Sequence, residues 1–82
     1  MGGNYPPLNR RQVEKILRAL GFTPKPRRSG TTHTQWEGYA GEKRRIVTVD
    51  DLGGANKTYG RRLLASMIRQ SGVSKEQFYN HL

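Results

Sequence analysis

The 82-residue chain contains no cysteine, and its six acidic residues are outnumbered by fifteen lysines and arginines. Without cysteine the chain forms neither disulfides nor thiolate metal sites, and we expect a protein of the reducing cytoplasm. No apolar run approaches the roughly 20 residues of a membrane-spanning helix. The first residues also lack the basic stretch and apolar run of a signal peptide. We therefore expect neither a membrane span nor a secretory leader.

Hydrophobic residues are also scarce, at 33% of the chain. At this length a single core is only marginally stabilising, so we expect one domain with a thin core. The segment before Asn9 carries Gly2-Gly3 and Pro6-Pro7. We expect a flexible N-terminus at residues 1–8 and a single domain at residues 9–82.

Positive charge is in excess, with a formal net charge of +9. On a salt-bridged solvent face basic residues alternate with acidic ones. Here they cluster instead, as Arg10-Arg11, Lys25/Arg27/Arg28, Lys43-Arg44-Arg45 and Arg61-Arg62. Such clusters favour a polyanionic partner through steering and counterion release. Nucleic acid, an acidic protein and an anionic membrane all fit, as does a surface that only aids solubility. Nucleic acid is favoured because no basic amphipathic membrane helix is evident.

The first helix is predicted from a cap and an apolar stripe. Asn9 and Gln12 have the spacing of a capping box, and Gly21 is suited to a left-handed C-cap. Between them, apolar residues recur at i, i+3, i+4 and i+7, as Val13, Ile16, Leu17 and Leu20.

A second helix is expected from a cap at Asn56 or Thr58 to about Ser71, closed by Gly72. Its apolar stripe is Tyr59, Leu63, Leu64, Met67 and Ile68. Ser74 and Gln77 form another capping-box pattern, which predicts a short helical turn that ends the chain.

Strands are expected between the two helices. The segment 22–28 contains two prolines, so any strand there is short and lies at a sheet edge. Thr31 to Tyr39 is rich in threonine and aromatic residues, and Arg44 to Val49 follows after a turn at 40–42. Trp36 should face the core, and alternation then places His33 on the opposite face. The fold class is α+β, with the order α-β-β-β-α, helices on one face of a three-stranded antiparallel sheet, and a short C-terminal helical turn.

His33 is the only histidine outside the C-terminal tail. Its imidazole can exchange a proton near neutral pH, and RNA carries its own nucleophile in the 2′-hydroxyl. One histidine among cationic side chains therefore suffices for a minimal, metal-free RNA-cleaving site. An RNA-binding domain with an incidental surface histidine fits the same pattern. Asp50-Asp51 alone is a weak metal signal, and no metal or other cofactor is expected.

Several landmarks together resemble the HicA family. They are Leu20-Gly21-Phe22 at the end of the first helix, Gly30-Thr31-Thr32-His33 at a strand start, and Gln70-Ser71-Gly72-Val73-Ser74 before Phe78. The resemblance covers roughly residues 8–78. It implies a small toxin with a double-stranded-RNA-binding-domain-like fold that cleaves mRNA, in a type II toxin-antitoxin system with an acidic HicB-like antitoxin.

The resemblance implies that His33 is the catalytic residue. The chain departs from the family pattern in two places. One more residue separates Gly30 from the histidine, and Asp50-Asp51 follow Val49 where the family tends to have proline and a basic or histidine-containing loop. Two acids there are expected to repel phosphate. RNA binding is assigned to ten residues: Arg27, Arg28, Thr31, Thr32, Lys43, Arg44, Arg45, Lys57, Arg61 and Arg62. Two alternatives stay open, a non-catalytic RNA-binding module of the same fold and a basic subunit that docks on an acidic protein.

Overall fold

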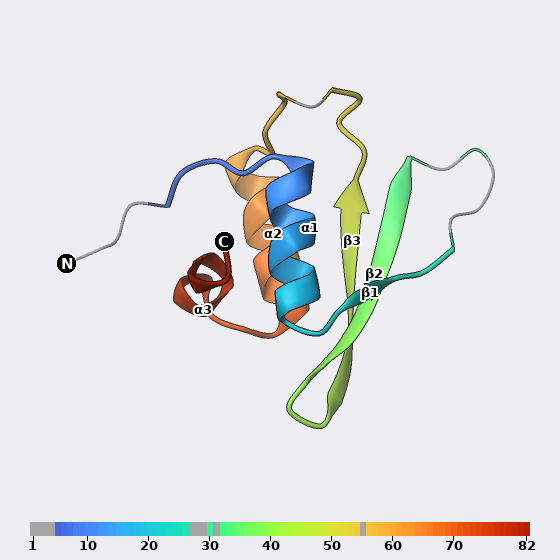
Figure 1. The fold of residues 1–82 in the computed structure, drawn as a ribbon, viewed down its shortest axis with the longest axis vertical. Helices are drawn as coiled ribbons and strands as arrows, with labels where there is room; N and C mark the ends of the chain where they lie inside the picture. Colours follow the sequence, from blue (N-terminus) through green and yellow to red (C-terminus); the bar gives the residue numbers. More distant parts are fainter. Residues whose placement is uncertain (1–4, 27–29, 31, 55) are drawn as a thin grey trace.

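The computed structural model describes residues 5–26, 30, 32–54 and 56–82. The chain order is α1 (Arg10–Ala19), β1 (Thr23–Pro24), β2 (His33–Ala40), β3 (Lys43–Asp50), α2 (Arg61–Ser71) and α3 (Lys75–Asn80). This is the predicted α-β-β-β-α order with a short terminal helix (Figure 1). The α+β prediction is confirmed.

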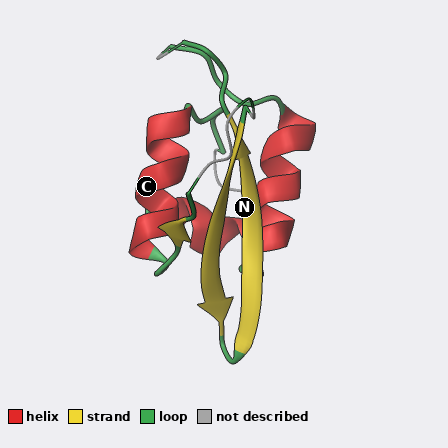
Figure 2. Cartoon of the chain, turned by 90° about the vertical axis from the view of Figure 1, so that its right-hand side faces the viewer, coloured by secondary structure: helices red, strands yellow, loops and turns green. Residues whose placement is uncertain are grey.

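The sheet is antiparallel throughout, in the order β1-β2-β3. The two long strands form a hairpin whose two-residue turn begins at Gly41, where φ is +65°. Glycine at the first turn position allows the backbone twist that matches paired strands. The hairpin lies in front of the helices in Figure 2, so the helices cover one face of the sheet.

Local capping boxes set the N-terminal ends of α1 and α3 as predicted. The Asn9 side chain accepts from the Gln12 backbone, and the Gln12 side chain accepts from the Asn9 backbone, both at 2.9 Å. Ser74 and Gln77 repeat this arrangement at 3.1 Å before α3. These reciprocal bonds satisfy backbone donors that have no partner inside the helix.

The predicted cap of α2 is wrong. The helix begins at Arg61, with Gly60 as its N-cap and no side-chain cap. Thr58 instead forms a β-bridge with Asn9, and the Tyr59 amide donates to the Leu8 carbonyl at 2.9 Å. Because this pairing holds residues 58 and 59 extended, the helix cannot start before them. Its C-terminus is as predicted, with Gly72 left-handed at φ +80°.

The core lies between the helices and the covered face of the sheet. Trp36 is buried there as expected, and the helical stripes supply Val13, Ile16, Leu17, Leu64, Met67 and Ile68. Leu8, which the sequence placed in a flexible N-terminus, is fully buried in the same cluster. The Tyr79 hydroxyl also donates to the Pro6 carbonyl at 2.7 Å. The packed domain therefore includes residues before Asn9.

Candidate functional site

His33 lies at the open end of the β2–β3 hairpin, opposite the turn, on the sheet face away from the helices. It is the first residue of β2, and it pairs in register with Asp50, the last residue of β3. Alternation along β2 explains the orientation: Trp36 is buried and His33 is exposed, as the sequence predicted. About half of the His33 side chain is open to solvent, at 53%. A ligand can therefore reach the imidazole.

The carboxylate of Asp50 contacts this imidazole directly. Its Oδ1 lies 2.5 Å from His33 Nδ1, and the Asp50 side chain is 30% exposed. From the sequence, Asp50 is expected to repel phosphate and, with Asp51, gives a weak metal signal. In the structure its carboxylate is in direct contact with the imidazole of the candidate catalytic residue, as an ion-pair partner.

Three hydrogen bonds hold this end of the hairpin in place. The Asp51 amide donates to the Thr32 carbonyl at 2.7 Å, extending the ladder by one bond beyond His33. The Tyr59 hydroxyl donates to the Asp50 carbonyl, also at 2.7 Å. The Asp51 carboxylate accepts the Gly53 amide at 3.0 Å. The backbone on both sides of the His33–Asp50 pair is therefore fixed.

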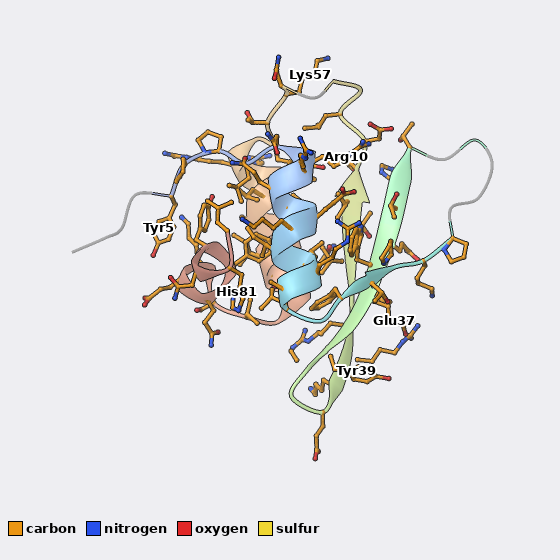
Figure 3. The ribbon with its side chains drawn as sticks, in the orientation of Figure 1. Tyr5, Arg10, Glu37, Tyr39, Lys57 and His81 are labelled. Carbon is orange, nitrogen blue, oxygen red and sulfur yellow. The ribbon has the colours of Figure 1, made fainter. Side chains whose placement is uncertain are left out.

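Among the described residues, Arg10 contacts the carboxylate that follows Asp50 in the chain. Its guanidinium lies 3.0 Å from the carboxylate of Asp51 and 4.0 Å from that of Glu14. Figure 3 shows Arg10 and Lys57 at the end of the molecule where β3 leads into its loop. A groove of about 750 Å³ separates this loop from the start of α1, with Arg10 and Arg11 in its lining. Arg10 was not among the predicted RNA-binding residues.

The predicted cluster at residues 43–45 lies at the opposite end of the hairpin from His33. Lys43 pairs with Ala40 beside the turn, seven residues along β2 from His33, about 23 Å at the usual rise per residue. Arg44 forms an ion pair with Glu37. The hydrogen bond from Arg44 lowers the pKa of Glu37, and the same pair raises the pKa of Arg44.

The Arg45 side chain packs against α2, unlike that of Arg44. It lies at the C-cap of α2, where a Cβ added to Gly72 would lie 2.8 Å from Arg45 Nε. Alternation along β3 places Arg45 on the face opposite Arg44. The three basic residues therefore do not form one surface.

Arg61 and Arg62 line a separate groove of about 810 Å³ between α2 and α3. Arg69 and Lys75 add two further cations, and Leu64, Ile68 and Tyr79 are among its apolar lining. Lys75 Nζ lies 4.5 Å from the centre of the Tyr5 ring at one edge. This groove combines positive charge with apolar surface, and no residue of the hairpin lines it.

The remaining predicted residues flank His33 in sequence. Thr32 is exposed, and Arg27, Arg28 and Thr31 lie outside the described residues. Within the described ranges, no group of three or more His, Cys, Asp or Glu side chains could hold a metal ion. In the same ranges, none of the helices is both long and apolar enough to span a bilayer.

Comparison with protein-family models gives a match over most of the chain. Residues 10–73 match the family described as the HicA toxin of bacterial toxin-antitoxin systems. The match runs from the first residue of α1 to just past α2, and so includes the whole sheet. A search of curated proteins finds no match. The family implies a partner antitoxin, and because its model covers well over half of the 82 residues, the chain belongs to the HicA toxin family.

Proposed function

We propose that this toxin is a metal-independent endoribonuclease that cleaves mRNA with His33 as its catalytic residue. The observation that carries the proposal is the placement of His33: half exposed, on the open sheet face, with Nδ1 held by Asp50. An imidazole held on one nitrogen presents the other to a substrate, which is the arrangement that general base catalysis needs.

The chemistry follows from the substrate. His33 Nε2 takes the proton from a 2′-hydroxyl, and the 2′-oxygen forms a bond to the adjacent phosphorus. The bond from phosphorus to the 5′-oxygen breaks, and that oxygen leaves with the electron pair and takes a proton from the imidazolium. The products carry a 2′,3′-cyclic phosphate and a 5′-hydroxyl. Cations stabilise the charge that develops on the phosphoryl oxygens.

The basic residues supply RNA affinity in this proposal. Thr32 lies next to His33, and Arg27, Arg28 and Thr31 precede it closely in sequence. We assign the phosphates close to the scissile bond to these four residues. Lys43, Lys57, Arg61 and Arg62 contact more distant phosphates, whereas Arg44 is engaged by Glu37 and Arg45 packs at the C-cap of α2. We assign the cytoplasm as the compartment, because mRNA is there, and an acidic HicB-like antitoxin as the protein that covers the His33 face.

The test compares His33→Ala with His81→Ala. His81 is the second histidine, at the C-cap of α3, where Nδ1 lies 2.7 Å from the Gln77 carbonyl oxygen. Purified proteins are incubated with RNA in EDTA, and the product ends are analysed. We expect cyclic phosphates from the wild type and from His81→Ala, none from His33→Ala, and no cleavage of DNA.

Two other outcomes would contradict the proposal. Equal cleavage by all three proteins would remove His33 from the mechanism. RNA binding without cleavage by any of them would favour the non-catalytic RNA-binding module.

A further inference from the structure

We propose that Asp50 is a positioning residue that fixes the tautomer of His33, so that Nδ1 carries the proton and Nε2 is the base. This inference rests on the proposed ribonuclease function for its catalytic consequence. Its structural part, which nitrogen carries the proton, is independent of any activity. The 2.5 Å contact between Asp50 Oδ1 and His33 Nδ1 carries it.

Hydrogen-bonding chemistry determines the direction of this contact. An ionised carboxylate only accepts hydrogen bonds, so the imidazole nitrogen that faces it must be the donor. In a neutral ring the other nitrogen then carries the lone pair. A neutral imidazole without a partner in water favours the opposite tautomer, with the proton on Nε2. Without Asp50, most neutral rings would therefore present an N–H to the 2′-hydroxyl instead of a base.

The backbone makes the carboxylate a fixed partner. His33 and Asp50 face each other in the β2–β3 register, and the Tyr59 hydroxyl anchors the Asp50 carbonyl at 2.7 Å. Tyr59 belongs to the buried core, so the anchor does not depend on a mobile surface group. The backbone that carries the Asp50 side chain is therefore held in place before RNA binds.

Contact with His33 explains why an acidic residue stands at position 50. A negative charge beside a phosphate-cleaving site repels the substrate and weakens its binding. Asp50 therefore needs a role that offsets this repulsion. Orienting the base and stabilising the imidazolium that forms during proton transfer is such a role. Figure 3 places the carboxylate of Glu37 further along the hairpin, nearer its turn, where it pairs with Arg44.

The test compares Asp50→Ala with Glu37→Ala, which removes the same charge from the same strand pair. Long-range proton–nitrogen correlation spectra of ¹⁵N-labelled protein, at a pH where the ring is neutral, distinguish the two tautomers of His33. We expect the Nδ1–H tautomer in the wild type and in Glu37→Ala, and mainly the Nε2–H tautomer in Asp50→Ala. Amide spectra of all three proteins check the fold.

Steady-state cleavage kinetics complete the test. Asp50→Ala should lower kcat at least about tenfold with little change in KM, whereas Glu37→Ala should change kcat by less than twofold. The Nε2–H tautomer in the wild type, or equal kcat for the two variants of an active wild type, would overturn the proposal. If the tautomer shifts as expected but the wild type cleaves no RNA, the ribonuclease function fails while Asp50 is supported as the residue that orients His33.

Discussion

The phenol of Tyr59 donates a 2.7 Å hydrogen bond to the backbone carbonyl of Asp50. This bond connects the segment that leads into α2 with the last residue of β3. Because Tyr59 is only 2% exposed, its ring also packs in the core while its hydroxyl reaches the site. Core packing and the geometry around His33 are thus linked through one side chain.

Burial of this phenol makes stability depend on pH in the alkaline range. Burial raises the pKa of Tyr59 to about 12 from its usual 10. Below pH 10 both folded and unfolded chains keep the proton. Between pH 10 and 12 the unfolded chain releases it and the folded chain retains it, so the free energy of unfolding falls as the pH rises.

We expect Tyr59→Phe to lose about 1 kcal/mol at pH 8, because the hydrogen bond to Asp50 is gone. From pH 9 to 11 its stability should decline less steeply than that of the wild type. Urea unfolding at several pH values measures both effects. Tyr39→Phe is the control, because Tyr39 is 62% exposed. A decline of the same slope in the wild type and in Tyr59→Phe would refute this account.

Gly38 is required by close packing against a ring. A Cβ at this position would lie 2.7 Å from Cγ of Phe22 and 2.8 Å from its Cδ1. Phe22 is buried, so it cannot swing into solvent to make room. We expect Gly38→Ala to destabilise the protein by about 1–3 kcal/mol.

Thermal or urea denaturation measures this effect, with Gly54→Ala as the control. At Gly54 the three atoms nearest to a Cβ would all belong to the Lys57 side chain, at 3.5 Å or more, so that variant should stay within about 0.5 kcal/mol of the wild type. Equal stability of the two variants would show that the Phe22 ring can move aside.

Local signals in the sequence were sufficient for the parts of the fold that local contacts determine. The Asn9 and Ser74 capping boxes involve residues three positions apart, so the spacing alone predicts them. The start of α2 could not be found in this way, because the bridge between Thr58 and Asn9 joins distant segments. A residue that can cap a helix does so only where long-range strand pairing leaves its backbone available for a helix start.

The His33–Asp50 pair was missed, although the sequence contains its signal. A two-residue turn at Gly41 makes each β2 residue pair with the β3 residue whose number adds to 83, so residue 33 meets residue 50. The predicted turn began at Ala40, one residue too early for this register. Basic residues were grouped by adjacency in sequence, yet alternation directs Arg44 and Arg45 to opposite faces.

The salt dependence of RNA binding should separate the cations that contact phosphate from those already engaged within the protein. On single strands the logarithm of affinity falls with the logarithm of salt concentration, with a slope of about −0.7 per phosphate contact. Arg62 is exposed and lines the groove between α2 and α3. Arg44 forms an ion pair with Glu37, so it releases fewer counterions when RNA binds.

We therefore expect Arg62→Gln to weaken binding and to make the slope shallower by about 0.7, whereas Arg44→Gln should leave the slope unchanged. Fluorescence anisotropy with a labelled single-stranded RNA measures both, using the His33→Ala background so that cleavage does not interfere. If Arg62→Gln keeps the full slope, the groove is not part of the RNA surface, and docking of an acidic protein becomes its better explanation. An equal loss in Arg44→Gln would show instead that RNA displaces Glu37 and that the hairpin end also contacts phosphate.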